Sequence, residues 1–276
     1  MAKPPQEFWR PTTRPTAPKQ THVMVAVFTE EERRGWVNPR LTTELMRIAL
    51  DPRVRISYVP IHGVHPVDAA RNMAVEDFFL KSDAQILVLF DNDVYPPSDI
   101  LDAILGMPEA CDIAVMPYWV WGADDFTVPC FGKWIDGTMV APDPATLVPG
   151  WQIMGSGGTG CMFIKRRVFT GGKLTAPFFK IVSDARKGQV VSEDIYFTGR
   201  ATEAGLQVWV NTDYICSHLR TLDLKEVNFG IVKILDRFVT QLRQQYGDHG
   251  IELGSLIHEL HPELKEAHRE LEAKKC

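Results

Sequence analysis

Short apolar runs alternate with helix-like stretches over roughly residues 21–118, and this alternation limits the possible folds more than any other feature. The runs at residues 22–28, 55–61 and 84–90 have the length of buried strands, and the stretches between them carry apolar residues at helical spacing. Strands that alternate with helices build βαβ units, in which helices cover a largely parallel sheet. The sequence therefore predicts an α/β fold with a mixed, mainly parallel central sheet flanked by helices.

The two ends of the chain differ from this central part. The first 20 residues carry five prolines and a small excess of basic charge, which favours an extended arm. The last part is helical in pattern, and one face is apolar at Ile231, Leu235, Phe238 and Leu242. That face could join subunits into an oligomer or pack back on the domain, which we favour. We expect an arm at 1–20, one domain at 21–220 and a helical extension at 221–276.

The composition excludes several classes of protein. With 45% hydrophobic and 24% charged residues, the chain resembles an average globular enzyme. Its apolar runs are far shorter than the about 18 residues that a membrane helix needs, and the N-terminus lacks the apolar segment of a secretory signal. Five cysteines without a CxxC pair indicate neither a disulfide framework nor a zinc cluster. We expect a cytoplasmic protein without a membrane partner, in the host cytoplasm if a phage encodes it.

An acidic segment directly follows the apolar run that ends at Phe90. It consists of Asp91, Asn92 and Asp93. In open α/β sheets, ligands bind at the carboxyl ends of strands, and carboxylates there suit Mg²⁺ or Mn²⁺ together with the phosphates of a substrate. The segment therefore indicates a metal–diphosphate site. Taken alone, it is equally compatible with a polar turn in which Ser98 or Asp99 caps the next helix.

A second acidic pair, Glu193 and Asp194, precedes an apolar helical pattern. The pair could simply complement the dipole of the first helical turn. However, the next apolar strand, near Val208, leads to His218, whose imidazole is a candidate third metal ligand.

Two further segments could contact a ligand. Arg71 could meet a diphosphate or an acidic neighbour, and the glycines at 155–160, which match no P-loop, let the backbone approach a ligand closely.

In this order the motifs resemble a GT-A-fold glycosyltransferase of the broad family-2-like type, which uses nucleotide-diphosphate sugars. The resemblance covers residues 21–220. It is carried by VMVAVF with Thr29 and Glu30, AARNMAVEDFF, ILVLFDNDVYPP, GTGCMFIKRRVF, SEDIYFTGRATEAGLQVWVN and His218. It implies a Rossmann-like mixed sheet, a Mn²⁺ or Mg²⁺ ion, and a nucleotide-sugar donor, for which we expect a UDP-sugar.

The resemblance also implies a role for each matching residue. Contacts with the nucleotide-sugar are implied for Phe28, Thr29, Glu30, Arg71, Asp91, Asn92 and Gly158. Metal ligation is implied for Asp91, Asp93 and His218. In inverting members the second acid of the pair is the general base, here Asp194, with Glu193 as the substitute. Such a base takes the proton of the acceptor hydroxyl, while the metal neutralises the leaving diphosphate.

Departures from the family pattern leave several points open. The first strand ends in Phe-Thr-Glu instead of Pro-x-Tyr-Asn-Glu, and the Gln-x-x-Arg-Trp segment of processive synthases is missing. The acceptor could be a glycan, a small molecule or a hydroxylated DNA base, and the stereochemical outcome is equally open. The aromatic-rich span from Pro117 to Trp134 could shape the acceptor side or form part of the core.

Three rival functions belong to other classes. A haloacid-dehalogenase-like phosphatase would use Asp91 as nucleophile, but its motif belongs on the first strand and needs a later acidic motif that this chain lacks. A nucleotidyltransferase would carry a glycine-rich basic loop after its first strand, which is also missing. A non-catalytic sugar- or nucleotide-binding module is the third alternative.

Overall fold

The computed structural model describes residues 20–29, 37–121, 127–136, 138–184, 189–219 and 240. Glu30, the N-terminal arm up to residue 19 and the apolar face expected at 231–242 lie outside the described residues. The expected boundaries of the arm and of the helical extension therefore stay predictions.

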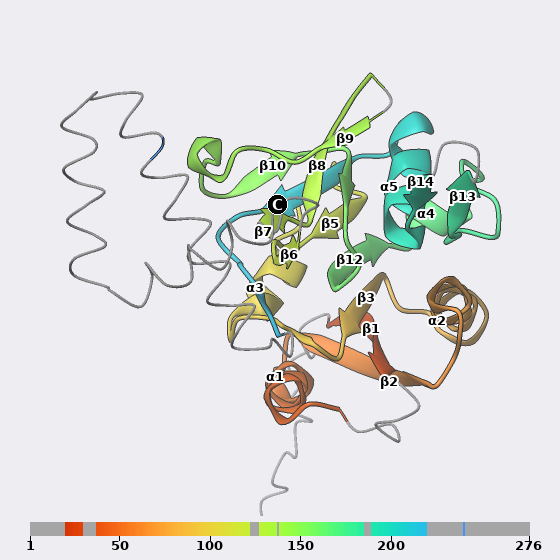
Figure 1. Cartoon of the computed structure of the whole chain (residues 1–276). Coiled ribbons are helices and arrows are strands. Elements are labelled where there is room, and N and C mark those ends of the chain that lie inside the picture. The colour runs from red at the N-terminus through yellow and green to blue at the C-terminus, as the bar shows by residue number, and fades with distance from the viewer. Residues whose placement is uncertain are drawn as a thin grey trace, which may run out of the picture.

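A seven-stranded sheet in the order β10-β15-β5-β12-β3-β1-β2 forms the centre of the described molecule (Figure 1). Its strands are β1 (Thr21–Thr29), β2 (Val54–His62), β3 (Ile86–Asp91), β5 (Ile113–Val115), β10 (Trp151–Ile153), β12 (Cys161–Lys165) and β15 (Val208–Asn211). β1 is parallel to β2 and β3, and β15 is parallel to β5, whereas β12 and β10 run antiparallel to their neighbours. All strands except β10 and β12 thus point the same way, as predicted.

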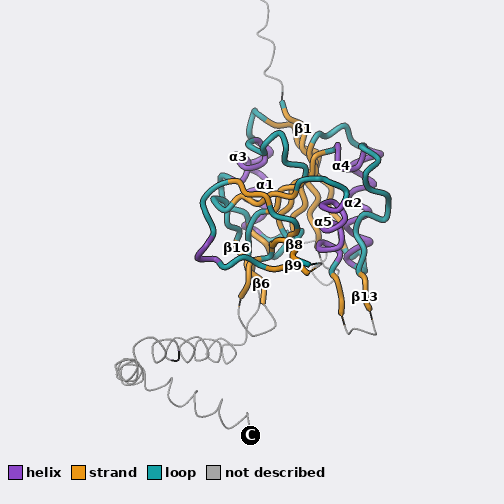
Figure 2. Tube along the Cα trace, turned by 90° about the horizontal axis from the view of Figure 1, so that it is seen from above, coloured by secondary structure: helices purple, strands orange, loops and turns teal. Residues whose placement is uncertain are grey.

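Helices cover both faces of this sheet. They are α1 (Pro39–Leu50), α2 (Val67–Lys81), α3 (Ile100–Leu105), α4 (Arg167–Thr170) and α5 (Glu193–Glu203), with a short 3₁₀ turn at Pro144–Thr146. Figure 2 shows α1 and α3 on one side of the sheet and α2, α4 and α5 on the other. Asn38 caps α1 by accepting the Arg40 N–H at 3.0 Å. Asp99 is the N-cap residue of α3, one of the two that the sequence predicts, but its side chain makes no capping hydrogen bond.

Short strands form smaller ladders around the sheet. They are β4 (Val94–Tyr95), β6 (Trp119–Trp121), β7 (Thr127–Pro129), β8 (Phe131–Ile135), β9 (Thr138–Val140), β11 (Ser156–Gly157), β13 (Val182–Asp184), β14 (Gln189–Val191) and β16 (Ser217–His218). β16 pairs with β4, so that His218 lies opposite Val94. The aromatic-rich span thus folds into the β6–β7 hairpin and β8, and its buried Phe131 belongs to the core.

The core is built around the central strands, which are apolar because both of their faces are covered. Residues 86–90 of β3 and 161–164 of β12 are all buried. Among the described helices, none has an apolar stretch long enough to cross a bilayer.

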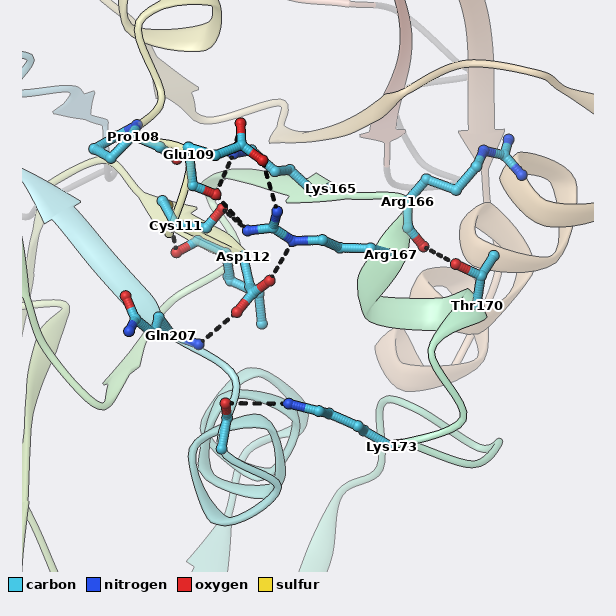
Figure 3. Close-up of polar contacts among 12 residues, drawn as sticks. Pro108, Glu109, Cys111, Asp112, Lys165, Arg166, Arg167, Thr170, Lys173 and Gln207 are labelled. Carbon is cyan, nitrogen blue, oxygen red and sulfur yellow. Dashed lines mark hydrogen bonds and ion pairs between the residues drawn. The ribbon is translucent and has the colours of Figure 1, made fainter.

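A paired polar network closes the amino-end edge of the sheet (Figure 3). Arg167 Nε donates to Asp112 Oδ1 at 2.6 Å, and the Gln207 N–H donates to Asp112 Oδ2 at 2.8 Å. Because Asp112 precedes β5, Gln207 precedes β15 and Arg167 follows β12, the network ties three strands together. Lys165 Nζ adds a hydrogen bond to the Pro108 carbonyl at 2.8 Å.

Candidate active site

A cavity of about 420 Å³ opens at the opposite edge, where β1, β2, β3 and β5 have their carboxyl ends. Its walls come from loops and helix starts that are far apart in the sequence. They are Phe28, Thr29, Ile61, Val64, His65, Val67, Ala70, Arg71, Asp91, Asn92, Asp93, Tyr118, Val120, Thr159, Glu193, Asp194 and His218. The fold therefore brings the two predicted acidic segments, Arg71 and His218 into one place.

Arg71 joins the two acidic segments from the first turns of α2. Its side chain is only 3% exposed; it donates to Asp91 Oδ1, and its Nε lies 3.8 Å from Glu193 Oε1. The guanidinium also lies 3.9 Å above the ring of Phe28, which is a cation–π distance. Arg71 Nε and Nη1 have no hydrogen-bond partner within the described structure. The predicted proximity of Arg71 to an acidic neighbour is therefore observed.

Glu193 opens α5 and is only 7% exposed. The pKa of its carboxyl is raised to about 7, mainly by burial and then by the charge of Asp194, against the opposing effect of Arg71. A carboxylate loses hydration when it is buried, so its neutral form gains relative to its charged form. Glu193 is thus an acid that titrates near neutral pH inside the cavity.

Asp194 lies beside Glu193 and is more accessible. Its Oδ1 accepts hydrogen bonds from the Ser192 hydroxyl and, at 2.7 Å, from the Ile195 N–H. These two donors fix the orientation of the carboxylate at the start of α5, where the helix dipole also favours negative charge. Its Oδ2 lies on the side of Gly158. The cavity thus presents an oriented carboxylate to a hydroxyl group of a ligand.

Asp93 and His218 form the part of the site that could hold a metal. Asp93 Oδ2 lies 3.5 Å from His218 Nε2, and the pairing of β16 with β4 brings them together. His218 Nδ1 lies 2.9 Å from the Trp119 carbonyl oxygen. A proton on Nδ1 satisfies that carbonyl and leaves Nε2 as a lone-pair donor toward Asp93, which is the tautomer that a metal ligand needs.

The three predicted metal ligands are not assembled into one cluster. Asp91 is directed to Arg71, and within the described residues no group of three or more His, Cys, Asp or Glu side chains is arranged to hold a metal ion. Carboxylate oxygen and imidazole nitrogen still suit Mn²⁺ or Mg²⁺, which often take only one or two protein ligands and complete their shell with substrate phosphates. The donor set thus fits a cation held by Asp93 and His218.

A second group of lining residues is mainly apolar. Ile61, Val64, Val67 and Ala70 contribute to it from the end of β2 and the start of α2. Thr29 lies at the end of β1, and its hydroxyl is 3.1 Å from His62 Nδ1. The lining of the cavity therefore has an apolar part and an acidic part.

Asn92 and Gly158, two of the residues predicted to contact the nucleotide-sugar, have structural contacts within the protein. The Asn92 side-chain oxygen accepts the Asn38 N–H at 2.7 Å and so ties the acidic loop to the start of α1. Gly158 is not a wall residue, but it lies directly behind Tyr118 and Asp194. Phe28 and Thr29 do line the cavity, whereas Glu30 lies outside the described residues.

Tyr118 belongs to the aromatic-rich span for which the sequence left a place at the acceptor side or in the core open, and it lines the cavity. It follows β5, is 6% exposed, and its hydroxyl accepts the Gly160 N–H at 3.2 Å. Burial raises the pKa of Tyr118 well above its ordinary value, and the nearby Cys130 and Asp91 add to that shift. Its position beyond the carboxyl end of a strand is a signal that could have identified it.

Comparisons with known proteins agree with this architecture. No family model matches the sequence, and no curated protein matches it. Among solved structures, A197 from STIV superposes with a TM-score of 0.50 and 18% identity over 73% of this chain and 87% of its own.

Two further solved structures superpose less closely. A Drosophila β1,4-galactosyltransferase 7 mutant, in complex with manganese, UDP-Gal and xylobiose, gives a TM-score of 0.44 and 13% identity over 73% of this chain and 71% of its own. GalNAc-T7 with UDP, GalNAc and Mn²⁺ gives 0.43 and 11% over 82% of this chain and only 51% of its own. At 18% identity the likeness to A197 is one of fold alone. The strand order confirms the predicted α/β fold with a mixed, mainly parallel central sheet.

Proposed function

We propose that this chain is a metal-dependent glycosyltransferase that moves a sugar from a nucleotide-diphosphate donor to an acceptor hydroxyl. One observation carries the proposal. Asp93 with His218, and Glu193 with Asp194, occupy the same cavity although more than 90 residues separate the acidic segments in the sequence. Glycosyl transfer needs these two functions side by side, a charged site for a diphosphate and a base for a hydroxyl.

The two parts of the cavity lining suit the two ends of such a donor. The apolar part from Ile61 to Ala70 offers a surface for a flat nucleobase, and the acidic part offers polar groups for the diphosphate and sugar. UDP-sugars are the donors that we favour. Manganese and uridine nucleotides bound to the galactosyltransferase and to GalNAc-T7 are in keeping with this choice.

Each acidic residue then has a distinct part. Asp93 and His218 would hold Mn²⁺ or Mg²⁺, which supplies positive charge against the leaving diphosphate. Asp194, oriented by Ser192 and the Ile195 N–H, would take the proton of the acceptor hydroxyl if the reaction inverts the anomeric centre. Arg71 keeps Asp91 and Glu193 together between these two groups. The acceptor class, a glycan, a small molecule or a hydroxylated DNA base, is left to experiment.

A donor hydrolysis screen tests this function. UDP-, GDP- and TDP-sugars are offered with Mn²⁺, and release of the nucleotide diphosphate is followed for wild type, Asp93→Ala and Asp194→Asn. We expect metal-dependent release from one donor class and a loss of at least about 100-fold in Asp93→Ala. Asp77→Asn is the matched control, because Asp77 pairs with Lys81 on the surface of α2 outside the cavity.

Other outcomes would point elsewhere. Silence with every donor, together with release of phosphate from simple phosphoesters that depends on Asp91, would favour the phosphatase. Binding of a nucleotide sugar without any turnover would favour a binding module.

A further inference from the structure

Tyr118 lines the cavity, and its hydroxyl is held at one fixed point beside Gly158 and Gly160. The ring packs edge-on against the imidazole of His218, with centroids 5.2 Å apart, and the hydroxyl oxygen accepts the Gly160 N–H at 3.2 Å. One side of this tyrosine therefore touches the part of the site proposed to hold the metal. The hydroxyl itself reaches toward the loop that carries Gly158.

Two glycines keep the space that this hydroxyl occupies. A Cβ atom on Gly158 would lie 2.2 Å from Tyr118 Oη, and a Cβ atom on Gly160 would lie 2.8 Å from Tyr118 Cζ. Real Cβ atoms do not approach backbone-anchored groups so closely, so only glycine at both positions lets the ring enter this far. The loop is thus shaped around the tyrosine hydroxyl.

The same point lies close to the proposed base. The Cβ position of Gly158 is also 3.4 Å from Asp194 Oδ2, so Tyr118 Oη and that carboxylate oxygen both lie close to Gly158. Within the described part of the chain, the hydroxyl proton of Tyr118 is paired with no acceptor, since the recorded hydrogen bond uses the oxygen as acceptor. A tyrosine is neutral at pH 7, so it can still donate this proton to a ligand.

We propose that Tyr118 is a catalytic residue that donates a hydrogen bond to the phosphate oxygen that leaves the sugar. This inference rests on the proposed function. In the step, the bond from the anomeric carbon to the phosphate oxygen breaks, and its electron pair leaves with the diphosphate. A new bond forms from the anomeric carbon to the acceptor oxygen, whose proton passes to Asp194. Tyr118 keeps its own proton throughout.

The chemistry assigns the hydroxyl to the leaving oxygen and not to the attacking one. A hydrogen bond donated to the acceptor hydroxyl would reduce its nucleophilicity, whereas the leaving oxygen gains negative charge as the bond breaks. A fixed donor at that oxygen binds the transition state more strongly than the ground state. The contact of Tyr118 with His218 places it beside the group proposed to hold the metal at the diphosphate.

The test compares wild type with Tyr118→Phe, using the donor that is turned over in the hydrolysis screen. We expect kcat for hydrolysis to fall roughly 100-fold, the size typical of one lost transition-state donor. The Kd of UDP in the presence of Mn²⁺ should change less than about twofold. With added methanol, the ratio of methyl glycoside to free sugar should stay constant, because both products share one leaving group.

Tyr214→Phe is the matched control. Tyr214 packs against the core without lining the cavity, so its loss of a hydroxyl should leave hydrolysis unchanged. A second variant, Gly158→Ala, must displace the Tyr118 hydroxyl. Gly158→Ala should lower kcat about as much as Tyr118→Phe does. The double variant Gly158→Ala/Tyr118→Phe should have nearly the same kcat as either single variant, because both changes remove the same hydrogen bond. Tyr118→Phe and Gly158→Ala each test the role of the Tyr118 hydroxyl, so one variant suffices if the other is unstable.

Several results would overturn the assignment. Unchanged kcat in Tyr118→Phe would show that the hydroxyl takes no part, and a changed product ratio would assign it to the nucleophile. Weakened UDP binding with unchanged kcat would make it a ground-state contact. Failure of the proposed function is distinct from all of these, because wild type itself would then release no nucleotide.

Discussion

The two edges of the central sheet use the same kinds of polar side chains and differ in how these are paired. At the amino-end edge, Asp112 meets Arg167 (Figure 3). Arg166 donates to the carbonyls of Ser82 and Ala84, both at 2.6 Å. At the other edge, the charges of Asp91, Glu193 and Asp194 all act on the single guanidinium of Arg71. The first edge is neutralised within the fold, whereas the second carries an excess of negative charge.

This contrast separates polar groups that hold the fold from polar groups that await a ligand. Paired groups stabilise a fold only modestly, but an unpaired buried charge costs several kcal/mol, so an excess of like charge indicates a binding partner of opposite charge. The proposed divalent cation is such a partner. Substitutions at the amino-end edge should therefore change stability alone, whereas substitutions at the carboxyl-end edge should change both stability and activity.

Replacement of Arg71 should have the largest effect on stability. Arg71→Met removes the cation shared by Asp91 and Glu193, and breaking such a buried pair costs roughly 3 kcal/mol. Urea denaturation with and without Mn²⁺ measures the loss, and Arg71→Lys, which keeps the charge, should recover part of it. If Arg71→Met were as stable as wild type, the stability of the carboxyl-end edge would not depend on the ion pairs of Arg71 more than the amino-end edge depends on its own ion pairs.

Glu193→Gln should act in the opposite direction and only at higher pH. The pKa of Glu193 is raised from 4.5 to about 7 in the folded chain. Between these values the unfolded chain loses the proton first, so stability falls as pH rises toward 7 and then stays low. Glu193→Gln should remove this penalty, worth roughly 2–3 kcal/mol above pH 7 and nothing near pH 4.

Denaturation curves at several pH values measure this difference. Glu203→Gln, at the exposed C-terminal end of α5, controls for the loss of one acidic charge on the same helix. Parallel stability curves for wild type and Glu193→Gln would mean that Glu193 is already ionised and fully paired with Arg71.

Asp112→Ala should have the smallest effect, and only on stability. It deletes the acceptor for Arg167 and for the Gln207 N–H, which we expect to cost about 1–2 kcal/mol because Arg167 is partly solvated. The kcat of donor hydrolysis should not change. If the variant lost activity under conditions in which it is fully folded, the amino-end edge would influence the cavity. The proposed difference between the two edges would then be wrong.

Much of the site could be predicted because it follows from strand ends. The apolar run before Asp91 identifies a buried strand, and its carboxyl end is where ligands bind, so Asp91 and Asp93 fall in the cavity. The resemblance to GT-A enzymes then indicated His218, which the structure brings to 3.5 Å from Asp93.

Other features depend on contacts that periodicity does not encode. The reversed direction of β12 leaves no trace in its apolar pattern, because a strand buried on both faces reads the same either way. The position of Arg71 between Asp91 and Glu193 requires α2 and α5 to lie on the same face of the sheet. Tyr118 acquires its place from two glycines more than 35 residues away in the chain.

The two-residue ladder between β4 and β16 has a consequence for how the protein is made. It joins Asp93 to His218 although more than 100 residues separate them in the chain. Closing so long a loop costs entropy that only the folded sheet between them can offset. A nascent chain that has emerged only as far as β15 would therefore contain every strand of the central sheet and still bind no cation between these two side chains. If Asp93 and His218 hold a cation as proposed, metal affinity would mark the completed synthesis and folding of the domain.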